Sequence, residues 1–485
     1  MPYASWIVVA LFAADLLMRV GLSVRIIMRR LPVGVSLAWL GVVLIFPFGG
    51  GAIYLLLGEL RLGKRRAAWA AAIHPPYEQW IDSVRLRSNV DWPALGQECE
   101  PLSRLINAVV GIPTFPGNEL QLLDDAEGVF RSLIADIDAA RHTCHMEFYL
   151  WNVGGTADEV ASALLRAAAR GVICRVLVDA VGSRSFLRSR LTQRLRHGGV
   201  ALHAALPGGL LRGLFVRFDL RLHRKIAVID GEIAYTGSLN MVDPRCFKKG
   251  VGLGPWVDAM VRLRGPAVEG LATTFLEDWE LETGEGIEEV AESGDIHPLH
   301  PCGTAAVQVT PSGPLVKNEA IQQILLMAIY EARRELVLTT PYFVPDESLR
   351  TALTSAARRG VAVTVIVPGK VDSLLVRLAS QAHQGDLTAA GVNVALFRGG
   401  LLHTKSITVD GEFSLFGSLN LDPRSLHLNF EITLAVYDRP FTRQLRGLQQ
   451  SYLDRAEPMD LAAWQARSGR VRFVENVARL LGPLL

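Results

Sequence analysis

The feature that most constrains this chain is a polar pattern that occurs twice. The stretch HRKIAVIDGEIAYTGSLN begins at His223, and the stretch HTKSITVDGEFSLFGSLN begins at His403. Both carry His, Lys, Asp, Gly, Ser and Asn at the same places. A single His-x-Lys is common, but six matched positions that recur at one spacing indicate a shared chemical task.

Each copy predicts two strands joined by a tight turn. His403 and Lys405 are two residues apart in a β-branched, alternating segment, so their side chains should project from one face. The Asp-Gly pair that begins at Asp410 is a strong hairpin signal, and the returning strand should bring Ser418 and Asn420 back toward the histidine. The first copy repeats this arrangement with His223, Lys225, Asp230, Ser238 and Asn240.

A longer repeat surrounds the motifs. Residues 144–180 and 336–369 each have the pattern of a strand, a turn, an amphipathic helix that ends at Arg-Gly-Val, and a second strand. Gly171 and Gly360 suit left-handed helix ends. Alternating strands and helices predict an α/β fold, here two pseudo-symmetric lobes, each a mixed β-sheet flanked by helices.

Two apolar runs precede these lobes. The first contains Asp15 and Arg19, whereas the second is uncharged from Leu31 to Gly58. A membrane-spanning helix needs about 20 mostly apolar residues. The second run meets this directly, and the first does so if Arg19 reaches the interface or the helix pairs with its neighbour. We therefore expect a transmembrane helical hairpin, whose orientation the flanking arginines leave open.

The predicted domains follow from these patterns. The expected boundaries are a transmembrane hairpin at 1–60, a juxtamembrane linker at 61–105, a first lobe at 106–280, an acidic linker at 281–305 and a second lobe at 306–485.

Composition narrows the possible partners. The chain has 485 residues, of which 50 are Lys or Arg and 48 are Asp or Glu. Nucleic-acid binders more often show a basic excess or stripe, so we expect no nucleic-acid partner. The five cysteines are scattered and odd in number, which disfavours a disulfide framework or a zinc site.

The paired motifs suit phosphoryl transfer. Two histidines, two lysines and two asparagines around one anion could stabilise the negative charge that spreads over phosphate oxygens in the transition state. One histidine could attack phosphorus while the other moves protons. No metal or other cofactor is expected, because the lysines supply positive charge.

The pattern H-x-K-x4-D-x6-G-S-x-N resembles that of the phospholipase D superfamily. The apolar N-terminal hairpin and the segments VQVTPSGP, TTPYFVPDESL and LDPRSLHLNFEI are further similar to bacterial cardiolipin synthases. This resemblance covers nearly the whole chain. It implies transfer of a phosphatidyl group from one phosphatidylglycerol to another, giving cardiolipin and glycerol, at a bacterial inner membrane with cytoplasmic lobes.

The resemblance also implies roles for individual residues. His223 matches the family's nucleophile and His403 its general acid/base, although two identical motifs do not rank themselves. The expected phosphate ligands are Lys225, Lys405, Asn240 and Asn420, with Ser238 and Ser418 as secondary donors. The resemblance implies an acid downstream of each motif that holds a histidine, namely Asp258 after the first motif and Glu431 after the second. Asp230 and Asp410, although part of the named motif, are expected to be turn and framework residues.

Several alternatives stay open at this stage. The acceptor could be water or another alcohol, which would make the chain a phospholipase D or a different phosphatidyltransferase, and the same chemistry could cleave DNA. A silent membrane scaffold is disfavoured by the intact motifs. Segments 206–221 and 464–485 could contact lipid or pack on the lobes. Oligomeric state is not indicated.

Overall fold

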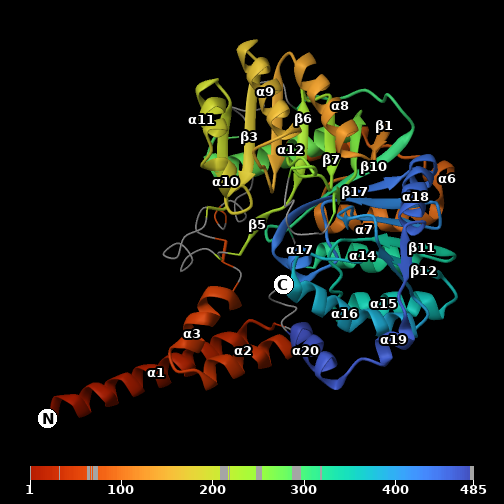
Figure 1. Cartoon of the computed structure of the whole chain (residues 1–485). Helices are drawn as coiled ribbons and strands as arrows, with labels where there is room; N and C mark the ends of the chain where they lie inside the picture. Colours follow the sequence, from red (N-terminus) through yellow and green to blue (C-terminus); the bar gives the residue numbers. More distant parts are fainter. Residues whose placement is uncertain are drawn as a thin grey trace. The chain divides into compact units, whose positions relative to one another are not determined.

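The computed structural model describes residues 2–31, 33–59, 61–62, 66, 68, 75–207, 217, 219–246, 254–286, 296–316 and 319–480. The chain forms two compact units. The first comprises Met1–Ala72 with Gly208–Leu220, and the second comprises Ile73–Pro207 with Arg221–Leu485. Figure 1 shows both, and each is described by itself.

The first unit is helical. Its elements are α1 (Pro2–Met28), α2 (Val33–Ile45), α3 (Gly49–Ile53) and a π-helical turn, η1 (Tyr54–Gly58). Within the described residues, one helix is long and apolar enough to cross a membrane, namely Trp6–Met28 of α1. A small cluster that contains Ile26, Val43 and Tyr54 holds α1 against the second apolar run.

The second apolar run is not the uninterrupted span that its hydropathy predicts. Helix α2 ends at Ile45, and the chain turns at Phe46–Phe48 before α3 begins. Pro47 accounts for this break, since proline has no N–H and disfavours a helical conformation for the residue before it. The expected second span is therefore divided into α2, α3 and η1.

The charges of the first run are satisfied within this unit. The Asp15 carboxylate accepts a hydrogen bond from the Phe48 N–H at 2.8 Å, where the second run is broken. Arg19 pairs with Asp15 at 2.6 Å and donates to the Leu44 carbonyl at 2.5 Å. The prediction that Arg19 is tolerated through a neighbouring helix thus agrees with the structure.

The second unit contains the two lobes, built on one continuous sheet. Its strand order is β18-β13-β12-β11-β15-β16-β17-β10-β1-β9-β7-β6-β2-β3-β4, with β5 beside β17. The first lobe contains β1 (Phe115–Leu123), β2 (Thr143–Phe148), β3 (Ile173–Asp179), β4 (Ala201–Ala205), β5 (Arg221–Leu222), β6 (Lys225–Ile229), β7 (Ile233–Gly237), β8 (Trp256–Val257) and β9 (Met260–Arg264). The second contains β10 (Ala305–Ser312), β11 (Glu335–Thr339), β12 (Ala362–Pro368), β13 (Asn393–Phe397), β14 (Leu401–Leu402), β15 (Ser406–Val409), β16 (Phe413–Gly417), β17 (Asn429–Tyr437) and β18 (Ala456–Pro458).

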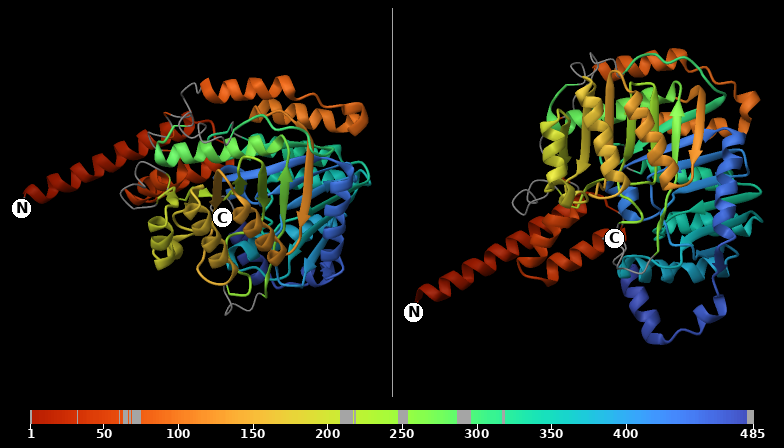
Figure 2. Two further views of the ribbon diagram at one scale, coloured as in Figure 1. Left: turned by 90° about the horizontal axis from the view of Figure 1, so that it is seen from above. Right: turned by 45° about the horizontal axis from the view of Figure 1, so that its top comes forward.

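This strand order confirms the predicted repeat. The order β4-β3-β2-β6-β7-β9-β1 of the first lobe matches β13-β12-β11-β15-β16-β17-β10 of the second, and antiparallel pairing of β1 with β10 joins them. The two glycines expected at helix ends, Gly171 and Gly360, both have φ of 90°. The two halves of the sheet and their helices are seen from two further directions in Figure 2.

Helices cover both halves. The first lobe has α8 (Ala126–Ala139), α9 (Thr156–Ala169), α10 (Arg184–Leu187), α11 (Arg190–His197) and α12 (Ala267–Thr283). The second has α14 (Ala320–Glu331), α15 (Glu347–Arg358), α16 (Leu374–Ala389), α17 (Pro423–His427), α18 (Arg439–Leu453), α19 (Leu461–Gln465) and α20 (Gly469–Leu480). One core cluster packs α8 and α9 on the first lobe, and another packs α14 and α15 on the second.

A third core cluster joins the lobes. It combines Ile226 and Val261 of the first lobe with Val337 and Ile432 of the second, together with residues of α12 and α18. Burial of apolar surface on both sheet faces explains why the strands are hydrophobic nearly throughout. The shared core fixes the two motif-bearing hairpins relative to one another.

The segment expected to be a juxtamembrane linker is largely helical. It contains α5 (Pro75–Arg87), α6 (Trp92–Leu95), a short 3-10 turn and α7 (Glu100–Val110). Leu102 and Ile106 of α7 are fully buried in the core of the second lobe. These two side chains lie four residues apart on one helical face, which is why a weakly patterned segment still packs as a helix.

Candidate active site

The two motif hairpins form as predicted. Strands β6 and β7 pair antiparallel around Asp230, and β15 and β16 do so around Asp410. The φ angles of Asp230 and Asp410 are 53° and 54°. The Asp230 carboxylate accepts backbone N–H groups of Arg141, His142 and Thr143 at 2.7–2.9 Å. Asp410 similarly accepts from residues 333–335, so both acids brace the framework.

The strand that carries each histidine differs from the expectation. It is interrupted at the histidine, where the backbone changes partner to the other lobe. Strand β5, just before His223, pairs in parallel with β17, and the His223 N–H donates to the Phe430 carbonyl at 2.9 Å. Strand β14 pairs likewise with β8, and the His403 N–H donates to Val257 at 2.8 Å. Each histidine is therefore held partly by the opposite lobe.

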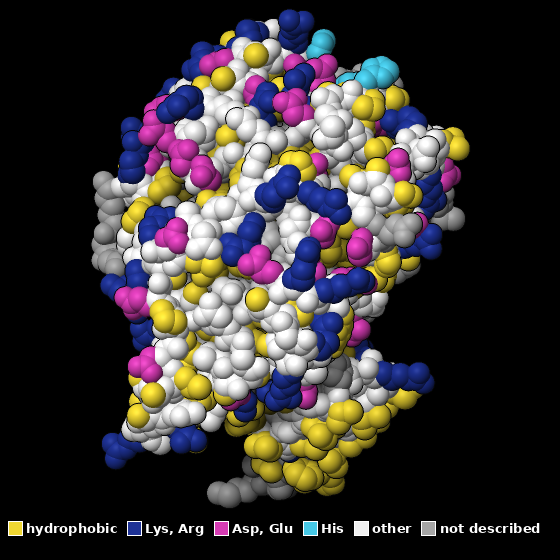
Figure 3. Space-filling view, turned by 90° about the vertical axis from the view of Figure 1, so that its right-hand side faces the viewer, with side chains coloured by type: hydrophobic (Ala, Val, Ile, Leu, Met, Phe, Trp, Pro, Cys, Tyr) yellow, Lys and Arg dark blue, Asp and Glu magenta, His cyan; other side chains and the backbone are white. Residues whose placement is uncertain are grey.

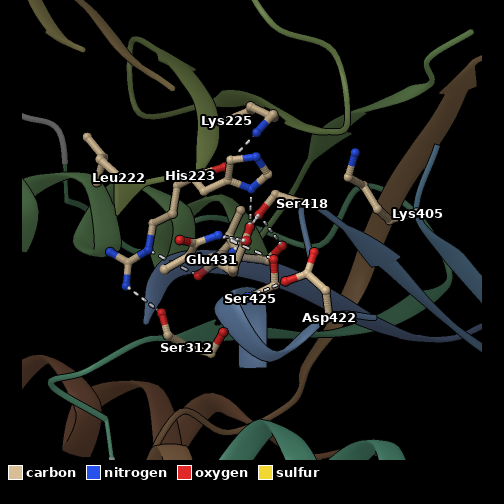
Figure 4. Close-up of polar contacts among 12 residues, drawn as sticks. Leu222, His223, Lys225, Ser312, Lys405, Ser418, Asp422, Ser425 and Glu431 are labelled. Carbon is tan, nitrogen blue, oxygen red and sulfur yellow. Dashed lines mark hydrogen bonds and ion pairs between the residues drawn. The ribbon is translucent and has the colours of Figure 1, made fainter. Parts of the chain in front are cut away.

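The carboxylate partners of the histidines cross between the lobes. Nδ1 of His223 lies 2.8 Å from Oε2 of Glu431, which belongs to the second lobe. Nδ1 of His403 lies 2.6 Å from Oδ1 of Asp258, which belongs to the first lobe. A carboxylate on Nδ1 fixes the ring and leaves Nε2 available for chemistry. Figure 4 shows His223, Lys225, Lys405 and Glu431 gathered at one place.

The two motif serines, which are expected to be secondary phosphate donors, bond the acids in this structure. The Ser238 hydroxyl donates to Asp258 at 2.7 Å, and the Ser418 hydroxyl donates to Glu431 at 2.6 Å. Each oxygen also accepts the backbone N–H of the residue that follows the acid, Ala259 for Ser238 and Ile432 for Ser418. The serines thus orient the carboxylates and have no proton left for a phosphate.

The motif glycines are explained by the same strands. A β-carbon at Gly237 would overlap backbone atoms of Ala259 and Met260, and one at Gly417 would overlap backbone atoms of Ile432 and Thr433. These neighbours follow the orienting acids directly in sequence. Glycine allows the two strands to approach closely enough for serine to reach the carboxylate.

The two lysines are buried cations. Lys225 is fully buried and Lys405 is 3% exposed. Each ammonium donates to the carbonyl of its own motif histidine, at 2.6 Å for Lys225 and 2.5 Å for Lys405. Burial lowers the pKa of Lys225 to about 8 and that of Lys405 to about 7, while the charges of Asp258 and Glu431 act to raise them. An incoming anion would favour the charged forms.

The histidines are held neutral in the same site. Burial lowers the pKa of His223 to about 4, although the Glu431 charge opposes this. Burial also lowers the pKa of His403, and the charge of Lys405 contributes. Lys405 further acts on His223, and Lys225 acts on His403, so the motifs lie within electrostatic reach of each other. A neutral imidazole with Nδ1 bonded to a carboxylate presents Nε2 as a nucleophile.

Burial raises the pKa of each orienting acid, but the neighbouring histidine and lysine reverse that effect. The hydrogen bond with His403 and the charge of Lys405 lower the pKa of Asp258, and the hydrogen bond with His223 and the charge of Lys225 lower the pKa of Glu431. Both carboxylates are therefore ionised, as a histidine partner requires. The remaining predicted phosphate ligands, Asn240 and Asn420, are buried at the ends of the motifs.

Two aromatic rings at the site were missed by the sequence reasoning. The Tyr149 ring lies 5.0 Å from the His223 ring, and the Trp256 ring lies 4.7 Å from the His403 ring, between centroids. Both aromatic residues belong to the first lobe, so the rings beside the two histidines are not related by the repeat. The available signal for Trp256 was its position two residues before Asp258 in a strand-like apolar run of the sequence.

Arg224 was also missed, and it distinguishes the two motifs. Its buried guanidinium donates to the Glu431 carbonyl at 3.1 Å and pairs with Asp278. The second motif has Thr404 at this place, which bonds the Tyr452 hydroxyl at 3.0 Å. The sequence did contain a signal for this ion pair. Arg224 is a charged residue in a segment expected to be buried, and a buried charge is normally paired.

Other predictions concern metals and surfaces. Within the part of the chain that the structure describes, no group of three or more His, Cys, Asp or Glu side chains is placed to hold a metal ion. Most of segment 206–221 lies outside the described residues. On the face in Figure 3, basic and acidic side chains are interspersed, with no single basic stripe.

Comparisons with known proteins agree with this geometry. The family model described as "Cardiolipin synthase, PLD-like domain" matches residues 133–249 and 325–451. Cardiolipin synthase A of Erwinia tasmaniensis is 44% identical over 96% of both chains, and that of Escherichia coli O1:K1 / APEC is 43% identical over the same shares. The crystal structure of phosphatidylserine synthase from Haemophilus influenzae shares the fold, with a TM-score of 0.58, 15% identity and coverage of 80% of this chain and 100% of that one.

Proposed function

This chain belongs to the bacterial cardiolipin synthases with phospholipase D-like domains, and from that premise we propose how its site transfers a phosphatidyl group. The observation that carries the proposal is the crossed pair of histidine–carboxylate contacts beside two buried lysines. The donor is phosphatidylglycerol, and the acceptor is the glycerol hydroxyl of a second phosphatidylglycerol. The products are cardiolipin and free glycerol.

In the first half-reaction, Nε2 of His223 attacks the phosphorus of the donor. The bond from phosphorus to the headgroup glycerol breaks, and His403 gives its proton to the departing oxygen. His223 suits attack because its pKa of about 4 keeps it neutral. His403 suits proton donation because the bound phosphate anion adds a charge that favours its protonated form. Such acid assistance contributes about 10²–10⁴-fold to rate.

In the second half-reaction, neutral His403 removes the proton from the acceptor hydroxyl. The resulting oxygen attacks phosphorus, the phosphorus–nitrogen bond to His223 breaks, and cardiolipin leaves. Glu431 holds the His223 ring through both steps, and Asp258 does the same for His403. Both histidines return to their starting protonation states.

Positive charge for both steps comes from Lys225 and Lys405, with amide donors from Asn240 and Asn420. Because the ammonium groups are buried, their interaction with a phosphate oxygen is weakly screened by water. Preorganised donors of this kind stabilise developing charge without rearrangement during the reaction. The proposed mechanism needs no metal.

We also propose that the N-terminal unit anchors the enzyme in the bacterial inner membrane, with the lobes on the cytoplasmic side. Helix α1 forms one pass, and α2, α3 and η1 together form a second. A broken helix is tolerated in a membrane where a neighbour satisfies the freed backbone groups. Asp15 meets that need at Phe48. Labelling of single cysteines placed at Arg30 and Leu86 in sealed vesicles tests this topology.

The function is tested with purified full-length protein in mixed micelles that contain phosphatidylglycerol as the sole phospholipid. Mass spectrometry follows cardiolipin, phosphatidic acid and glycerol, with and without EDTA. Wild type should release cardiolipin and glycerol in equal amounts, unaffected by EDTA. His223→Ala and His403→Ala should each lose turnover.

Trapping of the intermediate separates the histidines. His403→Ala should still accumulate a phosphatidyl group on His223, detected as an acid-labile mass addition on that peptide, whereas His223→Ala should carry none. The reverse pattern would exchange their roles. Phosphatidic acid without cardiolipin would show that water is the acceptor and that the enzyme is a phospholipase D.

A further inference from the structure

The last helix, α20, is amphipathic, and it packs on the second lobe with its small, polar side. Ala478 and Glu475 are the buried residues of this helix. Ala478 meets Val344 and Ala379 in a small cluster, and Glu475 pairs with Arg467. Of the two alternatives for the C-terminal tail, packing on the lobes is thus observed for the narrow face of α20 that contains Glu475 and Ala478.

The apolar side of α20 points away from the lobe. Phe473 is 69% exposed and Leu480 is 75% exposed, and Val474 and Val477 are also exposed. At 100° per residue, Phe473, Val477 and Leu480 lie on the side of the helix opposite Glu475 and Ala478. Soluble proteins usually place such a stripe toward their own core. Among the described residues nothing covers it.

The neighbouring helix extends this surface. Helix α16 packs along α20, and its first residues, Leu374 and Leu375, are exposed. We call Leu374, Leu375, Phe473, Val474, Val477 and Leu480 the apolar patch. Exposed apolar side chains on two helices that pack together indicate a surface that contacts something else.

Basic side chains accompany the apolar patch on both helices. Arg470, Arg472 and Arg479 of α20 are exposed, as are Lys370, which precedes α16, and Arg377 in its first turn. The one acid of α20, Glu475, is buried and paired. Apolar side chains with arginines on the flanks match the acyl and headgroup layers of an anionic bilayer surface.

The two helices that carry the apolar patch are connected to the active site through Val344. Val344 packs against Ala379 and Ala478, and its N–H donates to the Leu421 carbonyl at 2.9 Å. Leu421 directly follows the motif residue Asn420. Asp372, two residues before Leu374, bonds the Tyr342 hydroxyl at 2.9 Å in the same loop region. Helices α16 and α20 lie side by side in Figure 1 and in Figure 2.

We propose that the apolar patch docks the second lobe on the surface of an anionic phospholipid bilayer. The choice of lipid as occupant rests on the proposed function. Docking would let a substrate headgroup reach the buried histidines while its acyl chains stay in the bilayer.

A fluorescent probe tests the contact directly in the full-length protein. Cys246 and Cys302, the exposed cysteines, are first changed to serine. A Phe473→Cys variant is labelled with nitrobenzoxadiazole and reconstituted in vesicles of phosphatidylglycerol and phosphatidylcholine. Its emission should shift to the blue and be quenched by doxyl groups on acyl chains. The matched control is Ala362→Cys, at the exposed first residue of β12, which should show neither effect.

Three results of this experiment would overturn the proposal. Probe emission insensitive to vesicles would show an unoccupied face. Emission that changes with protein concentration but not with lipid would assign the apolar patch to a second copy of the chain. Emission shielded from doxyl lipid in every condition would assign it to the chain's own N-terminal helices.

Activity gives a second, independent readout. Phe473→Glu should lower the rate on long-chain phosphatidylglycerol in vesicles by roughly tenfold, because one apolar side chain removed from water contributes about one decade to partitioning. The rate on monomeric dihexanoyl phosphatidylglycerol should not change, and Phe473→Leu should behave as wild type. Equal losses on both substrates would show a folding role and reject docking. Absence of cardiolipin from wild type with either substrate would reject the proposed function and leave the probe result to decide docking.

Discussion

At the scale of single residues, the crossed carboxylates should set the two limbs of the pH profile. The proposed reaction needs His223 neutral, with a pKa of about 4, and needs His403 and Lys405 protonated, the latter with a pKa of about 7. The profile of kcat/KM, which reports the free enzyme, should therefore rise as His223 loses its proton and fall as His403 loses its own, which happens below the pKa of Lys405 because burial lowers the pKa of His403.

Two amide variants should move different limbs. Asp258 raises the pKa of both His403 and Lys405, so Asp258→Asn should move the basic limb to lower pH. Glu431 raises the pKa of His223 through its charge and hydrogen bond, so Glu431→Gln should move the acid limb to lower pH. Glu431 also raises the pKa of Lys405, so a smaller downward shift of the basic limb should accompany this change. Both variants should also lose rate, as their histidines lose orientation. If the two shifts are exchanged, His403 is the nucleophile.

Arg224 should be needed for stability because its charge is buried. Arg224→Met leaves Asp278 without its ion partner and removes the hydrogen bond to the Glu431 carbonyl. Removal of one member of a buried pair costs about 3–5 kcal/mol in the free energy of unfolding. Chemical denaturation in detergent measures this.

The matched control is Arg104→Met, which breaks the surface pair of Arg104 and Glu100. Exposed pairs contribute about 0–1 kcal/mol, so this variant should unfold close to wild type. If Arg224→Met lowers the free energy of unfolding as little as Arg104→Met does, then Arg224 contributes no more than an ordinary surface charge.

At the scale of elements, the motif glycines should be required for strand spacing. Gly417→Ala places a methyl group against the backbone of β17, the strand that carries Glu431. Overpacking of this kind costs about 1–3 kcal/mol. A shift of about 1 Å in a catalytic group can reduce the rate about 10²-fold, so we expect both Tm and kcat to fall.

Gly447→Ala is the control for this change. Gly447 lies in α18, and a β-carbon there would have no neighbour within 4 Å. Alanine is favoured over glycine in a helix by about 1 kcal/mol, so this variant should keep or gain stability and keep full activity. An active, stable Gly417→Ala would contradict the close approach of β16 and β17.

The elements also show what the sequence could and could not predict. The hairpins and the strand–helix–strand repeats were predictable, because their turn residues and periodicity are local signals. The crossing at His223 was not, since β5 has two residues, Arg221–Leu222, and pairs with a strand far away in sequence. The identity of each histidine's carboxylate depends on that crossing.

In the apolar N-terminal runs, a local signal was present in the sequence but was concealed by averaging. Hydropathy averaged over the second run hides Pro47, whose local effect ends α2 at Ile45. The charge in the first run appeared unfavourable, but Asp15 is satisfied by the very break that the average concealed. A polar residue in one helix was thus a signal of irregular backbone in its neighbour.

At the scale of the whole molecule, the two lobes should lose structure together. Strand β1 connects them, because it pairs with β10 of the second lobe. The buried side chain of Asn118 on this strand makes three hydrogen bonds to backbone groups. Its amide donates to the carbonyls of Phe115 and Ala305 at 2.7 and 3.1 Å, and its oxygen accepts from the Ala267 N–H at 2.8 Å. Asn118→Ala would leave these backbone groups unpaired, at a cost of about 1–3 kcal/mol for each buried group.

Hydrogen exchange shows whether that loss reaches both lobes. In Asn118→Ala, exchange should accelerate by one common factor in β3 of the first lobe and β12 of the second, because a shared core and a continuous sheet open as one unit. Asn393→Ala, on the exposed start of β13, should change neither strand. Acceleration confined to one lobe would show that the lobes unfold separately. In that case the crossed histidine contacts would have to form when two folded lobes dock, and each lobe would hold its own histidine without a carboxylate until docking was complete.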